Sequence, residues 1–317
     1  MGLRRFILKR LLAVVPILLG VSIITFALVH LTPSNPVEIL VGLNPDMTAG
    51  DRARLSAQYG LDKPVYQQYF IWLSNVLTGD FGIVYASNRQ VSTVIAARLP
   101  NTIALGLFGW VFALVIAIPT GIYAAVNKDD PGDHLSRFLA LFGISIPNFW
   151  LGLMLILVFA LWLDLWPVLA PREPLYSPEM LWYLILPGLT IGTASSAILM
   201  RIMRSTMGQE MNKDYVTAAR AKGLPERTVI LKHVLRNSLI SVTTVAAFLT
   251  AGILAGSVVV EVVFNWPGLG RELVNAVTAR EINLILAITL FTGLALVIAN
   301  LLADIAYAVL DPRIRYE

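Results

Sequence analysis

Cysteine is absent from this 317-residue sequence, and its absence excludes several kinds of site. Without thiols the chain forms neither a disulfide nor a cysteine-ligated zinc or iron–sulfur site. The only three histidines (His30, His134 and His233) are widely separated, so we expect no metal site. Charge is also scarce: 14% of residues are charged and 57% are hydrophobic, with a mean hydropathy of +0.73. Soluble domains carry about 25% charged residues, so this chain is predicted to lie in a membrane.

Signatures of catalysis are missing as well. The sequence has no G-x-x-x-x-G-K-[ST] phosphate loop, no serine nucleophile elbow and no H-E-x-x-H helix. The apolar runs hold no pair of carboxylates of the kind that proton-coupled carriers often use. The chain is therefore expected to be neither an enzyme nor an ATP-binding protein, with no cofactor of its own and no nucleic-acid partner.

Long apolar runs are what the sequence has in abundance. A helix needs about 20 apolar residues to cross the hydrocarbon core of a bilayer. Six runs reach that length and predict an all-α, multi-pass membrane protein of one domain, residues 1–317. The six predicted spans cover about 11–31, 101–126, 138–163, 180–200, 238–260 and 282–303.

Basic residues set the predicted orientation. The segment 201–237 carries eight Lys and Arg, against one in 164–179 and two in 261–281. Because Lys and Arg accumulate in cytoplasmic loops, we place 201–237 and both termini in the cytoplasm. The first apolar run lacks a small-x-small cleavage pattern and is longer than a signal-peptide core, so it is interpreted as an uncleaved first helix.

The segment 32–100 is predicted to be an extracytoplasmic insert that forms a small folded domain. Within it, apolar residues recur at helical spacing over 61–73, with Asp62 as the expected N-cap and Pro64 in the first turn. The sequence Gly79-Asp80-Phe81-Gly82 predicts a turn.

Polar residues inside the apolar runs raise the question of a transport pathway. Ser145 and Asn148 flank Pro147 in the third span, and Thr193 and Ser195 lie in a small-residue cluster of the fourth. Small residues favour close helix packing, which is the simpler interpretation of that cluster. Polar groups at bilayer depth also line aqueous paths, and for Asn148 the two interpretations stay equally open.

The hydrophilic segment Asp214–Asn237 predicts two helices separated by a sharp stop. Gly223 is suited to end a helix because glycine enters the left-handed region cheaply, and Pro225 is suited to the first position of the next helix. Tyr215, Ala218, Ala219 and Lys222 are expected to share one helical face. A basic loop held by anionic lipid would explain the charge but not this geometry, so we interpret the segment as a docking surface.

Several motifs now support a resemblance to a known family. Thr217–Gly223 (TAARAKG) resembles the EAA-x3-G loop of permease subunits from binding-protein-dependent ABC importers, with Thr217 in place of Glu. His233–Arg236 replaces the I-x-L-P end of that motif; the peptide branch often relaxes both positions. The flanking residues resemble the dipeptide, oligopeptide and nickel branch, as do Gly60-Leu61-Asp62 with Gln68-Tyr69, Gly79–Gly82, Glu261–Gly270 and Asp311–Tyr316.

The resemblance implies a type I ABC importer permease fold in the cytoplasmic (inner) membrane of a prokaryote. It implies as partners a second homologous permease, two cytoplasmic ATPases that bind ATP and Mg²⁺, an extracytoplasmic substrate-binding protein and membrane lipid. The ATPase-coupling residues would be Asp214, Tyr215, Ala218, Ala219, Arg220, Lys222, Gly223, Leu224 and Pro225. The loop on the binding-protein side would hold Glu261, Phe264, Trp266, Gly268 and Gly270.

The substrate stays open between di- or oligopeptides, glutathione and nickel, since the permeases of this branch share the motifs. A different class, an ion-coupled secondary carrier, predicts transport by this chain without an ATPase. A membrane-embedded enzyme would need a catalytic constellation that the sequence lacks. Neither of these explains the Asp214–Asn237 loop.

Overall fold

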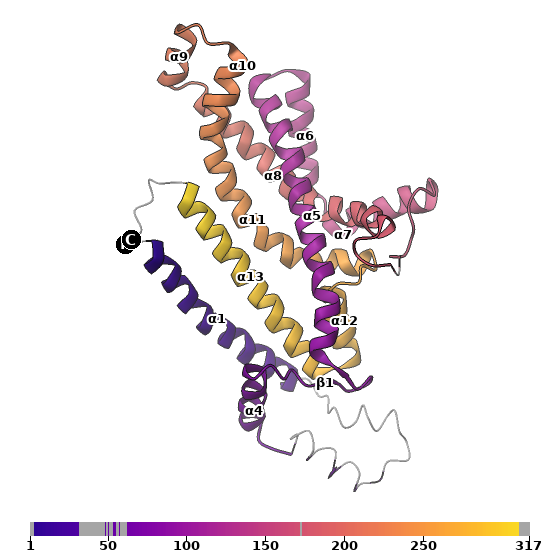
Figure 1. Cartoon of the computed structure of the whole chain (residues 1–317). Helices are drawn as coiled ribbons and strands as arrows, with labels where there is room; N and C mark the ends of the chain where they lie inside the picture. The colour runs from indigo at the N-terminus through magenta and orange to yellow at the C-terminus, as the bar shows by residue number, and fades with distance from the viewer. Residues whose placement is uncertain are drawn as a thin grey trace. The chain divides into compact units, whose positions relative to one another are not determined.

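The structure is a computed structural model that describes residues 3–31, 48, 50, 53–54, 57, 62–171 and 173–310. The described part of the chain is mostly helical, at 81%. Figure 1 shows the elements, which in chain order are α1 (Leu3–Leu31), α4 (Val65–Leu77), β1 (Ile83–Val84), β2 (Arg89–Gln90), α5 (Val91–Val126), α6 (Pro131–Ser145), α7 (Asn148–Leu155), η1 (Ile156–Trp162), α8 (Pro178–Glu210), α9 (Asp214–Ala221), α10 (Glu226–Thr228), η2 (Val229–Val234), α11 (Leu235–Val263), α12 (Leu269–Ala279) and α13 (Ile282–Leu310).

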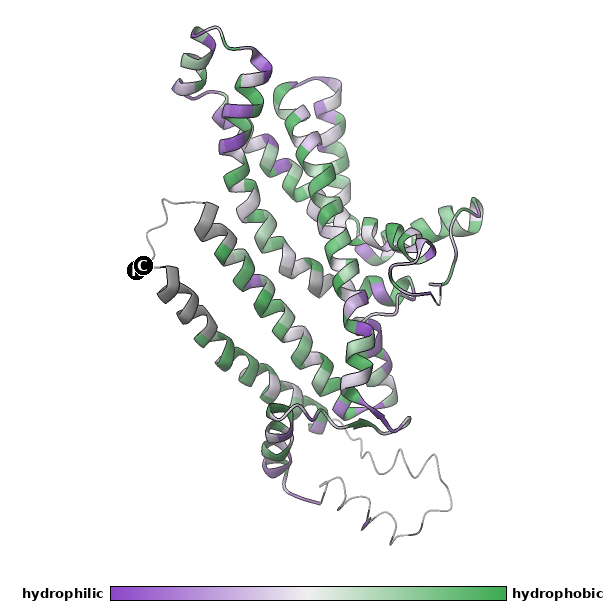
Figure 2. Cartoon of the chain, viewed as in Figure 1, coloured by the Kyte–Doolittle hydropathy of each residue, from purple (hydrophilic) through white to green (hydrophobic). Residues whose placement is uncertain are grey.

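Within the described residues, four helices are long and apolar enough to cross a membrane: α1, α5, α8 and α13. The bent pair of α6 with α7 and η1 makes a fifth if it counts as one span. Figure 2 shows how apolar residues dominate these helices. The predicted span 238–260 falls within the 29-residue helix α11. The count of six spans stays a prediction.

The third predicted span, 138–163, contains Pro147 and is not one continuous helix. The chain forms α6 and then α7 with η1, and the two parts meet at an angle of 106°. Ile146 leaves the helical region at φ −83° and ψ 126° because Pro147 disfavours helical backbone in the residue before it. The second part ends in π-helical turns, Ile156–Trp162.

Other helices are longer than their apolar runs. The helix predicted to begin at 101 begins at Val91 and passes through Pro100, and the one predicted to end at 200 continues to Glu210. Outside the bilayer a helix can carry charged residues without the free-energy cost of burying them in lipid. The hydropathy of the sequence therefore locates the apolar part of a helix but not the ends of the helix.

The chain divides into two compact units, and the described residues of the first are 3–7, 102–266 and 298–310. Its centre is α8, which begins with Ser177 as an N-cap accepting from the Met180 amide, followed by Pro178. Helix α5 meets α8 backbone to backbone: a Cβ added to Gly192 would stand 2.5 Å from the Gly109 carbonyl oxygen. Only glycine permits an approach this close.

The second unit holds residues 8–101 and 267–297, as far as they are described. Strands β1 and β2 form an antiparallel hairpin in which Ile83 pairs with Gln90. Glu281, which is buried, accepts hydrogen bonds from the backbone amides of Tyr85 and Ala86 at 2.7 Å each. The Asn283 amide also donates to the Ile83 carbonyl, so the start of α13 holds the hairpin in place.

The predicted insert 32–100 is described only in part, and residues 32–47 with Gly60 and Leu61 lie outside the described residues. The N-cap of α4 is Pro64 and not the expected Asp62, because the extended Pro64 already offers its carbonyl to the Gln67 and Gln68 amides. The predicted turn at 79–82 is present, with Gly79 and Gly82 both at positive φ.

A buried ion pair joins α6 to α8. The Asp133 carboxylate accepts from Arg204 Nε at 2.6 Å and Nη2 at 2.7 Å, and also from the Asp129 amide at 3.0 Å. The Asp133 side chain is fully buried. Removing one partner of such a pair leaves a charge without compensation, which costs more than the pair itself contributes.

Asp133→Ala is therefore expected to lower the free energy of unfolding by about 3 kcal/mol. The measurement is the thermal midpoint of the detergent-solubilised protein. The double variant Asp133→Ala/Arg204→Met should recover part of the loss because it removes the stranded guanidinium. A single variant that melts with the wild type would contradict this role of the pair.

Candidate functional site

A hydrophilic loop joins α8 to α11, and it begins with the short helix α9 (Figure 2). Asp214 occupies the first turn of α9, where a carboxylate interacts favourably with the helix dipole. At the other end, the Gly223 amide donates to the Arg220 carbonyl at 2.9 Å and the Leu224 amide to the Ala219 carbonyl at 3.4 Å. This pair of bonds is a Schellman motif, which requires Gly223 at φ +75°.

The underside of α9 is apolar and packed. Val216 and Ala219 are buried in a cluster with Val229, Val234, Met203 and Met207, which come from η2 and α8. The loop is thus seated on the end of α8 by hydrophobic contacts. A displacement of α9 would have to carry this part of α8 with it or break that packing.

The opposite side of the loop, called its upper side here, is exposed. Between Asp214 and Pro225 the exposed residues are Asp214, Thr217, Ala218, Arg220, Ala221, Lys222, Gly223, Leu224 and Pro225. The prediction that Tyr215, Ala218, Ala219 and Lys222 present one face is wrong in part. Ala219 is buried, and Lys222 is the C-cap beyond the last turn of α9. The small centre of the exposed side is Ala218 with Ala221.

Two polar networks brace the loop. The Tyr215 hydroxyl donates to Glu210 at 2.6 Å and accepts from the Asn237 amide at 3.0 Å, so it ties α9 to both flanking helices. Burial, and then the bond to Glu210, raise the pKa of Tyr215, which keeps the hydroxyl protonated. Arg220 holds Glu226 through two bonds, of 2.6 and 3.1 Å, and thereby lowers the pKa of Glu226.

Pro225 lies one position earlier than predicted. It is the N-cap of α10, at φ −57° and ψ 137°, and not the first residue of the helix. Its carbonyl accepts from the Thr228 and Val229 amides. The π-helical turns of η2 follow directly, and these lead into α11. Such turns occur mostly as local insertions in helices, often at functional sites.

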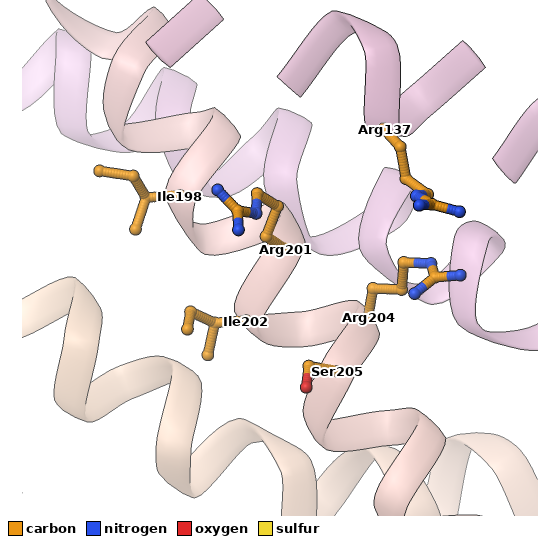
Figure 3. Close-up of a pocket in the computed structure, with 6 residues that line it drawn as sticks. All are labelled: Arg137, Ile198, Arg201, Ile202, Arg204 and Ser205. Carbon is orange, nitrogen blue, oxygen red and sulfur yellow. The ribbon is translucent and has the colours of Figure 1, made fainter. Parts of the chain in front are cut away.

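A basic cavity of about 520 Å³ lies where α6 and α8 end on the side of this loop. Figure 3 shows its lining residues Arg137, Ile198, Arg201, Ile202, Arg204 and Ser205. Arg204 forms the ion pair with Asp133, whereas the side chains of Arg137 and Arg201 are exposed. Arg201 directly follows the apolar run of α8, which is where snorkelling to lipid headgroups is expected.

The predicted pathway residues are distributed over α6, α7 and α8. Ser145 is exposed at the end of α6, and Asn148 is half-buried at the first position of α7, so both lie at the 106° bend. The Thr193 hydroxyl donates to the Leu189 carbonyl of its own helix at 2.6 Å. A Cβ added to Gly143 would meet Thr193 Cγ2 at 3.2 Å, which favours a packing role for Thr193. Ser195 is buried.

The predicted binding-protein loop, Glu261–Gly270, turns its named side chains inward. Phe264 and Trp266 are buried, and the Tyr183 hydroxyl donates to the Phe264 carbonyl while its ring stacks on Trp266. Glu261 is also buried and accepts from Thr102 at 2.8 Å. Gly268 and Gly270 are buried too. The named side chains therefore hold the shape of this segment and do not form its surface.

Sequence reasoning missed Glu210 and Asn237, which fix Tyr215. The sequence does carry a signal for Glu210, because it stands three residues before Lys213, a spacing that favours an ion pair on a helix. The structure contains this pair, at 2.5 Å. Asn237 lies 22 residues from Tyr215, and no local pattern links the two. Among the described residues, no group of three or more His, Cys, Asp or Glu is placed to hold a metal ion.

Apolar helices of spanning length joined by a braced hydrophilic loop define an integral membrane protein. The family model described as "Binding-protein-dependent transport system inner membrane component" matches residues 117–316, and its N-terminal companion matches 3–106. The chain therefore belongs to the family of inner membrane components of binding-protein-dependent transport systems.

Curated relatives match the chain over nearly its full length. It is 39% identical to the oligopeptide transport system permease protein AppB of Bacillus subtilis over 316 residues, covering 98% of this chain and 99% of the relative. A putative peptide permease of Brucella ovis is 39% identical over 315 residues, and the glutathione transport system permease protein GsiC of Escherichia coli (strain K12) over 313. Both comparisons cover 98% of this chain and 99% of the relative.

The ion pair between Arg220 and Glu226 yields a test of how the loop is braced. Arg220→Glu should loosen the loop because two carboxylates would then face each other. The expected result is faster cleavage after Lys222 by a lysine-specific protease. The swap Arg220→Glu/Glu226→Arg should restore the wild-type rate, and an unchanged rate in the single variant would show that the pair does not hold the loop.

Proposed function

We propose that this chain forms half of the translocation pathway of an ATP-driven importer and is coupled to separate ATPases through residues 214–237. The single observation that carries the proposal is the construction of the loop. Its upper side, around Ala218 and Gly223, is open and small, while its underside is packed onto α8. Such a loop can receive a push from a partner and transmit it to a long helix.

The partners follow from this role. A second homologous permease supplies the other half of the pathway, and two cytoplasmic ATPases, which bind ATP and Mg²⁺, each engage one such loop. A substrate-binding protein delivers cargo on the opposite side. In this arrangement 201–237 and both termini are cytoplasmic and 32–100 is extracytoplasmic, with the tail 311–317 lying outside the described residues.

For the substrate we propose di- or oligopeptides. Two of the relatives are called peptide permeases, and the third is called a glutathione permease. Glutathione is itself a small peptide, so the substrates in the names of these three relatives belong to one chemical class. Glutathione in particular, or nickel, is the alternative within the family.

Pathway lining is proposed for the bend that contains Ser145 and Asn148. Pro147 breaks the helix there and frees backbone groups at bilayer depth, which is tolerated only where protein or water satisfies them. Thr193 and Ser195 are weaker members of this set because their helix is packed around them.

Gly223→Val tests the coupling role. A β-branched residue resists left-handed backbone, which costs an L-residue about 1–2 kcal/mol even before branching. The variant should insert normally but lose substrate uptake and substrate-stimulated ATPase activity in the assembled importer. Gly223→Asn should retain part of both, because asparagine tolerates this region.

Gly208→Val is the matched control. Gly208 lies in α8 with the same open surroundings, since an added Cβ meets nothing within 4 Å at either glycine, but its φ is not positive. It should transport at close to the wild-type rate. Wild-type uptake by Gly223→Val would refute the coupling role, and uptake by this chain in vesicles without any ATPase would favour an ion-coupled carrier instead.

A further inference from the structure

Helix α4 combines features that do not suit a helix surrounded by water. Its 13 residues, VYQQYFIWLSNVL, include no charged side chain, and none of them is buried. Tyr66, Phe70 and Leu77 are 62, 65 and 79% exposed. Residues four and seven apart lie on one side of a helix, so these three form an apolar stripe facing outward.

The contacts of α4 place it alongside the apolar part of α1. Gln68 hydrogen-bonds His30 at 3.1 Å, and the Tyr69 hydroxyl bonds Ser22 at 2.9 Å. The rings of Tyr69 and Trp72 also lie 5.3 and 6.0 Å from that of Phe26. All of these residues belong to the second unit.

The position of Ser22 gives the depth of that contact. The apolar stretch of α1 that qualifies as a membrane span is Leu12–Leu31, so Ser22 lies nine residues inside its end. At 1.5 Å per residue this is about 14 Å of helix, against a hydrocarbon core of about 30 Å. A helix bonded at this point cannot stand clear of the bilayer unless much of α1 does so too.

A groove continues the same surface. Leu73, Val76 and Leu77 of α4 line it together with Val15, Leu18 and Leu19 of α1, and it has a volume of about 350 Å³. Phe81 and the α13 residues Leu290, Phe291 and Leu294 close its other side. Its one polar member, Ser22, is already satisfied by Leu19 and Tyr69.

We propose that α4 lies in the membrane interface at the C-terminal end of α1, with its apolar stripe and this groove occupied by lipid acyl chains. The groove is continuous with the exposed apolar surface of α1 at Val15 and Leu19, which lies inside the apolar stretch Leu12–Leu31. Aromatic residues suit this depth: Tyr and Trp concentrate at membrane interfaces, and α4 holds Tyr66, Tyr69 and Trp72. The polar side of α4, around Gln67 and Asn75, then faces water.

The absence of native cysteine makes a labelling test clean. Single variants Phe70→Cys and Leu77→Cys test the stripe, and Asn75→Cys tests the polar side of the same helix. Ser87→Cys, at an exposed position in the hairpin turn, is the water control, and Ile24→Cys, 61% exposed on α1, is the lipid control. Each thiol is challenged with a membrane-impermeant maleimide in vesicles leaky to the reagent.

The stripe thiols should react at least tenfold more slowly than Ser87→Cys, and Asn75→Cys should react like Ser87→Cys. A fluorophore attached to the stripe thiols in detergent should then be quenched by brominated lipid after reconstitution, as at Ile24→Cys. Fast labelling at both stripe positions would put α4 in water and overturn the proposal. Protection without quenching would show a protein partner on the stripe and would overturn it equally.

Discussion

The contact between Gly109 and Gly192 is the constraint on which the first unit depends. It brings the backbones of α5 and α8 within a distance that any side chain would prevent. Lipid tails are as apolar as leucine, so helix association in a bilayer comes from close packing and not from escape from water. Gly121 and Gly143 repeat the device: an added Cβ would stand 2.6 Å from Met203 and 3.2 Å from Thr193. Helix α8 is thereby fixed against α5 and α6 along its length.

This packing explains why the loop at the end of α8 is suited to transmit a displacement. Met203 and Met207 belong to the same buried cluster as Val216, Ala219 and Val234 of the loop. These side chains pack the loop directly onto the helix. The Asp133–Arg204 pair then ties the same end of α8 to α6. A force on the upper side of α9 therefore reaches two helices of the first unit through contacts that are stiff on the scale of a side chain.

Backbone requirements explain which features the sequence predicts and which it does not. Gly223 was predictable because a helix stop at positive φ has few solutions, and apolar runs were predictable because lipid demands them. Pro147 indicates a break in the third span but not its angle of 106°, since the size of the bend depends on how α7 packs against α8 and α11. The inward turn of Phe264 and Trp266 depends on Tyr183, some 80 residues earlier, and no local pattern carries that information. Ala219 was misplaced for a related reason: helical spacing gives a shared face but not which way that face points.

Buried and exposed polar interactions have different roles in this fold. Among the described residues, three buried carboxylates are hydrogen-bonded: Asp133 by Arg204 and an amide, Glu281 by two backbone amides, and Glu261 by the Thr102 hydroxyl. An unpaired charge in such positions would be costly, so these groups hold elements together and leave little freedom for chemistry. An exposed pair such as Arg220–Glu226 contributes little to global stability and links α9 to α10 locally. Small and basic residues are displayed on one braced loop, which is the property that the proposed coupling to a partner requires.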